Sequence, residues 1–168
     1  MKSAIAIIAV AVVASSADGS TPWEHYLDAP TSTNAALVMA IEYSPEAHER
    51  RLSAEDLQIL QNQILAQDHE AFRLALRLYH AADGGNGEVL GEMLARTIRG
   101  HPGFFLAEVA FTAEPCSEFS WILNTPGLEY VDRFEAQAYE ISMRKAALRS
   151  VRTKVLRRVR EECLRAFH

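Results

Sequence analysis

Histidine and glutamate are the side chains best suited to acid–base chemistry, and in this chain they are scattered. Two His-Glu steps occur, but neither has the second His four residues later that would place two metal ligands on one helical face. The best candidates for a site assembled from separate helices are His69 and His101, with Glu70 and Glu108 nearby. This pattern keeps a small exported hydrolase as an alternative, and we expect no metal and no cofactor.

Motifs that would identify an enzyme directly do not occur in the 168 residues. The chain has no G-x-S-x-G elbow, no H-E-x-x-H, no C-x-x-C and no P-loop. The Gly-rich segment 83–88 follows a helical pattern rather than a strand, and its glycines leave too few ligands for calcium. We therefore expect a turn between helices there, and a binding protein rather than an enzyme.

The strongest charge pattern lies at the C-terminal end. Residues 144–168 carry nine positive and two negative side chains, whereas residues 18–143 carry seven positive and 20 negative ones. Apolar residues at helical spacing occupy one face of this end, and Arg and Lys occupy the other. The pattern fits a solvated helix face, but it also predicts a binding surface for an acidic or anionic partner. The candidate binding residues are Arg149, Arg152, Arg157, Arg158 and Arg160.

The partner predicted for this surface is a protein, anionic lipid headgroups or a polysaccharide. Nucleic acid is disfavoured, because no aromatic residue interleaves the basic run before Phe167 and the rest of the chain is acidic.

The first residues have the pattern of a secretory signal. Lys2 precedes an unbroken apolar run of eleven residues, 4–14, and small residues follow as far as Ala17. The run is shorter than the roughly 20 apolar residues that cross a membrane, so we expect no transmembrane segment in the mature chain. We predict a cleaved signal at residues 1–17 and a periplasmic or secreted single helical domain at residues 18–168.

Cys116 and Cys163 are the two cysteines, and an exported chain usually pairs them. Residues 130–167 contain neither Gly nor Pro, which predicts one long helix or two helices broken near residues 150–153. One straight helix would carry Cys163 roughly 50 Å from Tyr130, out of reach of Cys116. An intrachain disulfide therefore requires a bend or a break, and a bridge between chains or two buried thiols are the alternatives.

Elsewhere, apolar residues recur at spacings of three and four, and no segment alternates as a strand would. The sequence therefore predicts an all-α protein. We expect an aromatic cluster, Trp23, His25 and Tyr26, to tether the N-terminal end to the core, and an exposed aromatic binding site is the alternative. The predicted helices begin near residues 31, 53, 68, 89, 101, 117 and 130.

One internal similarity bears on the architecture. Residues 69–75 and 101–107 match at four of seven positions, 32 residues apart. This period is typical of stacked helical hairpins, whose concave side often binds a partner. We predict a small irregular helical bundle or a short solenoid-like array of helical hairpins, with a long basic C-terminal helix. An adaptor, a chaperone or an inhibitor would fit such a surface.

Overall fold

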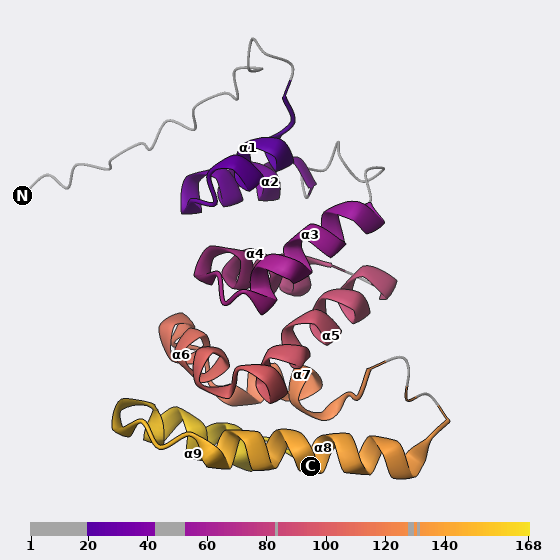
Figure 1. The fold of residues 1–168 in the computed structure, drawn as a ribbon, viewed down its shortest axis with the longest axis vertical. Helices are drawn as coiled ribbons and strands as arrows, with labels where there is room; N and C mark the ends of the chain where they lie inside the picture. The colour runs from indigo at the N-terminus through magenta and orange to yellow at the C-terminus, as the bar shows by residue number, and fades with distance from the viewer. Residues whose placement is uncertain (1–19, 43–52, 83, 128–129, 131) are drawn as a thin grey trace, which may run out of the picture.

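The computed structural model describes residues 20–42, 53–82, 84–127, 130 and 132–168. Every regular element within these ranges is helical, so the predicted all-α class is confirmed. The helices lie in successive layers along the longest axis, from α1 (Pro22–Asp28) to α8 (Phe134–Ser150) and α9 (Arg157–Arg165) (Figure 1). The predicted signal, residues 1–17, lies outside the described residues.

The first helix, α1, was not predicted from the sequence. Thr21 caps it, because the Thr21 hydroxyl accepts from the N–H of Glu24 while the Glu24 carboxylate accepts from the N–H of Thr21. Trp23 and Tyr26 are buried and pack edge to face with ring centroids 6.1 Å apart. Their burial agrees with the predicted tether, and α1 packs on α2 (Ser32–Glu42). Ser44 and Pro45, whose types would end this helix by sequence, lie outside the described residues.

The next two helices begin where the sequence predicted. Ser53 and Asp56 form the reciprocal capping box of α3 (Ala54–Leu65), with both hydrogen bonds at 3.0 Å. Asp68 caps α4 (His69–Ala81) by accepting from the N–H of Ala71 at 2.7 Å. Two short polar segments therefore fix where both helices start.

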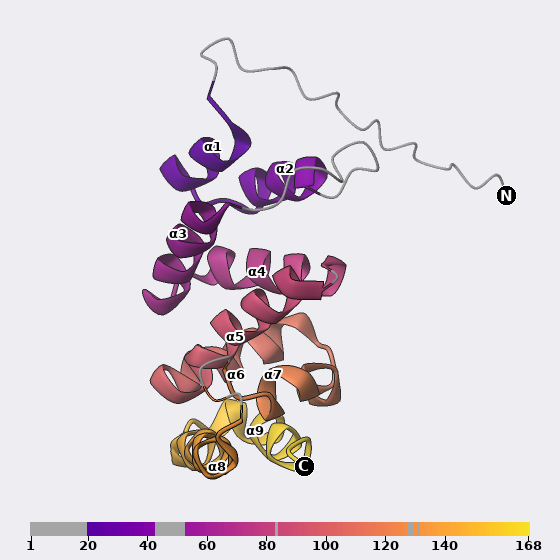
Figure 2. The same cartoon turned by 90° about the vertical axis from the view of Figure 1, so that its right-hand side faces the viewer.

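Helix α5 (Gly84–Gly100) is the centre of the fold. It packs against α3 and α4 on one side, and on the other against α6 (Pro102–Thr112), α7 (Ser120–Asn124) and α8. Figure 2 shows it between the N-terminal helices and the final pair, α8 and α9. Its buried side chains include Leu90, Met93, Leu94 and Ile98, so α5 joins the layers into one core.

The turn predicted at residues 83–88 is wrong for residues 84–88, because α5 already begins at Gly84; residue 83 lies outside the described residues. Glycine is unfavourable in a helix because it loses much backbone conformational freedom on folding. The buried residues further along α5 hold the helix in place, so tertiary packing outweighs the poor local propensity of the glycines.

The long continuous C-terminal helix is also corrected. Helix α8 ends at Ser150, a short 3₁₀ turn η3 (Lys154–Leu156) follows, and α9 returns along α8 (Figure 1). The alternative of two helices broken near residues 150–153 is therefore the right one. The break lets α9 bury Val159 and Cys163 against α6 and the 3₁₀ turn η1 (Cys116–Phe119).

The 32-residue similarity places its two histidines at helix starts. His69 is the first residue of α4, and His101 is the N-cap of α6. Pro102 follows as the first residue of α6, as predicted. A repeat origin for the two helix pairs stays a prediction.

Candidate functional site

The chain reverses direction between α8 and α9, and this reversal positions the candidate binding residues. Val151 is buried, and its carbonyl oxygen accepts a hydrogen bond from Nη1 of Arg160 at 2.5 Å. The buried side chains of Val159 and Cys163 turn the apolar face of α9 toward the body. The remaining basic residues are left on the outside of the reversal.

Five exposed cations surround the reversal, and we call them the basic tip. They are Arg149, Arg152, Lys154, Arg157 and Arg158. Among the residues that the structure describes, none of the five forms an ion pair or a side-chain hydrogen bond. The sequence has no Asp or Glu between residues 141 and 160, so Arg149, Arg152 and Lys154 have no acidic residue close to them along the chain. Arg157 and Arg158 lie one helical turn before Glu161 and Glu162, and besides the hydrogen bond of Arg160 the charge of Arg157 contributes to the lowered pKa of Glu161. Val155, which is 85% exposed, lies among these cations in η3.

Two other basic residues of this end are engaged within the protein. Arg160, a predicted binding residue, has a side chain only 16% exposed that bonds to Val151 and to Glu161. Its hydrogen bond to the Glu161 carboxylate lowers the pKa of that group. Lys145 donates to the carbonyl oxygen of His168. Four of the five predicted binding residues therefore belong to the basic tip. The fifth, Arg160, stabilises the reversal through its hydrogen bond to Val151.

Arg144 is buried and holds the short helix α7 in place. Its Nη1 donates to the carbonyl oxygens of Ile122, at 3.0 Å, and Thr125, at 2.9 Å, near the end of α7. Its Nε donates to Glu140 at 3.1 Å, and Arg99 of α5 pairs with the other Glu140 oxygen at 2.8 Å. This network joins α5, α7 and α8, and it leaves Arg144 unavailable to a partner.

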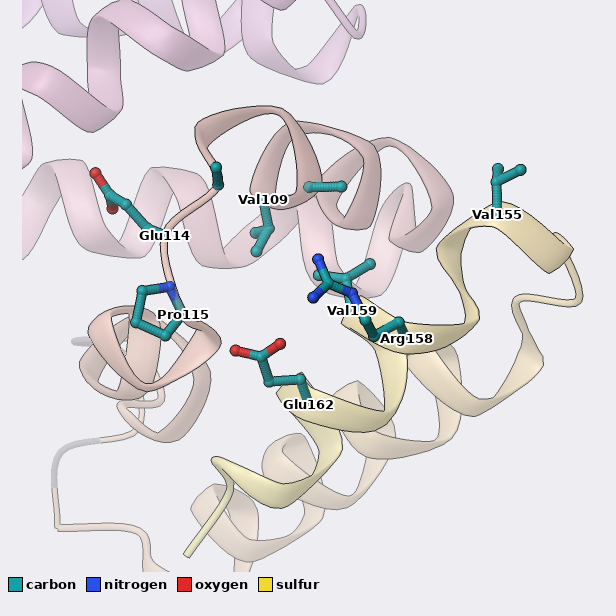
Figure 3. Close-up of a pocket in the computed structure, with 9 residues that line it drawn as sticks. Val109, Glu114, Pro115, Val155, Arg158, Val159 and Glu162 are labelled. Carbon is teal, nitrogen blue, oxygen red and sulfur yellow. The ribbon is translucent and has the colours of Figure 1, made fainter.

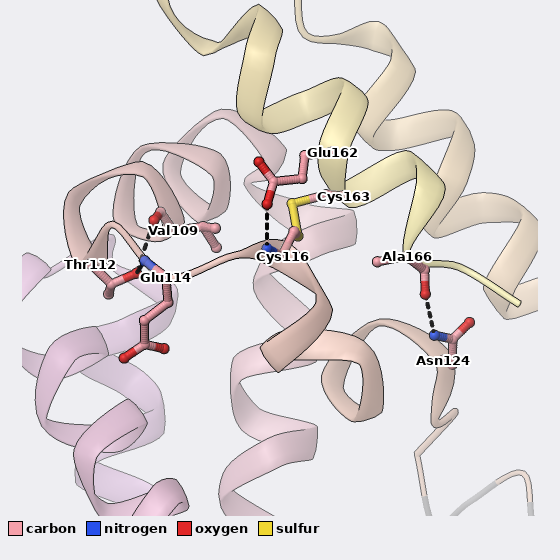
Figure 4. The surroundings of a disulfide bond; sticks show 8 residues. All are labelled: Val109, Thr112, Glu114, Cys116, Asn124, Glu162, Cys163 and Ala166. Carbon is pink, nitrogen blue, oxygen red and sulfur yellow. Dashed lines mark hydrogen bonds between the residues drawn. A yellow bond between two sulfur atoms is a disulfide. The ribbon is translucent and has the colours of Figure 1, made fainter.

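Cys116 and Cys163 form an intrachain disulfide between η1 and α9, with Cα atoms 5.0 Å apart. Both cysteines are fully buried. Beside them, Oε1 of Glu162 accepts from the N–H of Cys116 at 2.9 Å (Figure 4). The alternatives of an interchain bridge and of free thiols are set aside, and the bond fixes α9 against the segment that follows α6.

A groove of about 320 Å³ lies between the end of α6 and α9, next to the basic tip (Figure 3). Six of its lining residues are apolar and three are charged. The apolar ones are Val109, Ala110, Ala113, Pro115, Val155 and Val159, and the charged ones are Glu114, Arg158 and Glu162. Arg158 belongs to both the tip and the groove, so the two features form one continuous surface.

A second cluster of polar side chains joins α4 to α6. Glu108 is 1% exposed, and its Oε1 lies 2.5 Å from Nδ1 of His69. Its Oε2 accepts from Nε of Arg73 at 2.8 Å, and Arg73 also bonds to Glu70. Arg73 lies 3.5 Å from the centroid of the Phe111 ring. The structure therefore brings together three of the four residues singled out as acid–base candidates.

The fourth candidate, His101, is not part of this cluster. Its side chain forms no hydrogen bond or ion pair with any described residue. His80, at the other end of α4, lies 3.5 Å from a carboxylate oxygen of Glu114. Within the described ranges, no group of three or more His, Cys, Asp or Glu side chains could hold a metal ion.

A buried tyrosine lies near the same cluster. Tyr26 is fully buried, and its hydroxyl has no hydrogen-bond partner among the described residues. Burial raises the pKa of Tyr26, and the carboxylates of Asp68 and Glu70 raise it further. Tyr26 therefore stays neutral in the folded chain, where it is part of the core.

No matching protein gives the basic tip, the groove or the His69 cluster a function. No protein family, curated protein or solved structure matches this chain. No helix in the described part of the chain is long and apolar enough to cross a membrane. The features of this chain that bear on function are therefore the basic tip, the groove and the His69 cluster.

The binding residues predicted from the sequence did not include Lys154, although it is one of the nine cations counted at this end, and the groove was not predicted. Lys154 could have been found, because it lies in the same acid-free stretch, residues 141–160, as the predicted arginines. The groove had no such signal, since Val109 and Val159 are 50 residues apart and meet only because α9 folds back. The Glu108 bond to His69 likewise depends on how α6 packs on α4.

Proposed function

We propose that this chain is an exported, periplasmic or secreted, helical protein that acts by binding another macromolecule, as an adaptor, a chaperone or an inhibitor. The observation that supports the proposal is the basic tip, whose five exposed cations form no ion pair with any described residue. Charges that are not neutralised within a protein are free to attract an anionic partner. The acidic remainder of the chain repels such a partner elsewhere and would direct it to the tip.

The disulfide supports the exported location. Disulfides form and persist in oxidising compartments and are rare in the cytosol. The Cys116–Cys163 bond is therefore consistent with the signal that the sequence predicts at residues 1–17.

Neutralising the tip should weaken binding to a polyanion. We expect the triple variant Arg149→Gln, Arg152→Gln, Arg157→Gln to bind heparin, a sulfated polysaccharide, at least about tenfold more weakly at low salt, with a flatter dependence on salt concentration. The matched control is Arg77→Gln, Arg133→Gln, Arg165→Gln, which removes three exposed arginines outside the tip. Equal losses in the two variants would attribute binding to net charge and contradict a localised surface.

A hydrolase is the second candidate, and the bond between His69 and Glu108 favours it. A carboxylate that accepts from Nδ1–H leaves Nε2 of a neutral imidazole free to accept a proton. The His69 side chain is 61% exposed and Nε2 has no partner among the described residues, so solvent and a substrate can reach it. In this candidate His69 would act as a general base toward water, oriented by Glu108.

This candidate predicts that His69→Gln lowers hydrolysis of chromogenic esters, phosphate esters or glycosides by about 10²-fold or more. His80→Gln is the matched control, because His80 also lies on α4 beside a glutamate and outside the cluster. If the unmodified chain hydrolyses none of these substrates, or if both variants are equally affected, the hydrolase candidate is rejected.

A further inference from the structure

We propose that the groove between α6 and α9 binds a polypeptide segment that carries an aliphatic side chain next to a carboxylate. The inference rests on the proposed binding function and names the class of partner. The groove volume of about 320 Å³ is at the lower end of the range for specific ligand sites, about 300–1,000 Å³. Such a space accommodates one or two side chains rather than a whole domain.

The walls of the groove are mostly aliphatic, which favours an aliphatic side chain of the partner. Val109, Ala110 and Ala113 come from α6 and its C-cap, whereas Val155 and Val159 come from the opposite side. Val155 is 85% exposed, and Ala110 is exposed as well. Covering these methyl groups would remove apolar surface from water, which favours binding.

The charged residues of the groove indicate where the carboxylate of the partner would lie. Arg158 and Glu162 extend from α9 toward Val109 and Pro115 (Figure 3). Glu162 already accepts from the N–H of Cys116, and Glu114 lies near His80. Arg158 forms no ion pair among the described residues, and the adjacent tip adds further positive charge. An acidic residue of the partner therefore fits best at Arg158.

The groove is also held in shape before a partner arrives. The disulfide joins Cys116, just after the Ala113–Pro115 wall, to Cys163 of the α9 wall (Figure 4). A site that is already formed binds with less loss of conformational entropy. A covalent link between the two walls is therefore an advantage for a small docking site.

A polypeptide fits these features better than an anionic bilayer does. Glu114 and Glu162 line the same groove as Arg158, so a surface of many anionic headgroups would meet two like charges, whereas a single carboxylate can contact Arg158 alone. A bilayer surface also cannot enter a concave space between two helices, whereas a side chain can. Arg158 lies at the end of the groove next to the basic tip, and Glu114 lies at the other end (Figure 3). This arrangement suits a peptide whose acidic residue lies on only one side of its aliphatic residue.

The first experiment selects phage-displayed random peptides on the full-length oxidised chain. We expect enriched peptides to carry Asp or Glu within two positions of Leu, Ile or Val. Synthetic copies should bind at least about tenfold more weakly to Ala110→Phe, which fills the groove, and to Arg158→Gln, which removes the cation. The matched controls, Ala54→Phe on α3 and Arg77→Gln on α4, should bind as the unmodified chain does, because both residues are exposed and outside the groove.

The outcomes separate this inference from the proposed function. Ala110→Phe should keep heparin binding, because the tip is intact; if the unmodified chain binds no heparin, the proposed function fails instead. Peptides that are not enriched, or that bind Ala110→Phe unchanged, overturn the groove as a peptide site. Binding to phosphatidylglycerol-containing vesicles that Ala110→Phe abolishes would assign the groove to lipid and also overturn it. Thermal unfolding by circular dichroism verifies that each variant is folded.

Discussion

Replacing Cys116 and Cys163 together with alanine is expected to lower the free energy of unfolding by about 4 kcal/mol. The two residues are 47 positions apart, so the disulfide closes a long loop and removes many conformations from the unfolded chain. Chemical denaturation of the oxidised chain and of the double variant measures the difference. Alanine is preferred to serine, because a hydroxyl at these fully buried positions would add its own desolvation cost.

The control for this prediction is the unmodified chain in the presence of a reductant that reaches the buried bond during unfolding. Its stability should fall to nearly that of the double variant, and the oxidised chain should contain no free thiol. A loss of less than about 1 kcal/mol in the variant would mean that packing alone fixes α9, contrary to the loop-closure argument.

Replacing Arg144 with methionine is expected to destabilise the fold by about 3 kcal/mol, which is typical for breaking a buried charged network. The variant leaves the carbonyl oxygens of Ile122 and Thr125 without their donor and leaves buried Glu140 with Arg99 alone. Arg144→Lys should recover only part of the loss, because an ammonium cannot replace a planar guanidinium that serves several acceptors at once.

Arg149→Met is the matched control on the same helix. Arg149 is exposed and has no side-chain partner among the described residues, so its replacement should change the free energy of unfolding by no more than about 0.5 kcal/mol. The same variant should weaken heparin binding, which Arg149 serves as part of the basic tip. Equal destabilisation by Arg144→Met and Arg149→Met would contradict the structural role assigned to Arg144.

The helices that the sequence predicted well are those whose ends are set locally. Local hydrogen bonds mark the starts of α3, at Ser53 and Asp56, and of α4, at Asp68. The fixed dihedral angle of Pro102, after His101, marks the start of α6. Helix α1 could have been found by the same reasoning, because Thr21 and Glu24 have capping-box spacing. Local chemistry of this kind is readable without knowing the rest of the fold.

Features set by distant contacts could not be predicted in this way. The glycines at the start of α5 look like a loop, and only the packing of α5 makes them helical. Gly91 shows the same dependence, since a Cβ there would lie 2.1 Å from Cζ3 of Trp121. No local pattern around Gly91 indicates that an aromatic ring from α7 covers it.

The candidate site was predictable in part for the same reason. The basic tip was indicated by a run of cations without an acidic residue, but the reversal between α8 and α9 was needed to group these cations on the outside of one turn. Arg144 belongs to that run by sequence, yet it is buried because α7 ends beside it. The groove and the Glu108 bond to His69 join segments far apart along the chain, so they required the fold.

The disulfide also determines how this protein would respond to a mechanical pull applied to either side of the bond. Tension applied between residues 20 and 168 would pass through Cys116 directly into Cys163. Helices α7 and α8 lie inside the closed loop, so they would carry no tension while the bond is intact. Reduction would add roughly 160 Å of extensible chain, at about 3.4 Å per residue over the 47 positions. In single-molecule stretching, the oxidised and reduced forms of this bond would therefore be distinguished by the length of the fully extended chain.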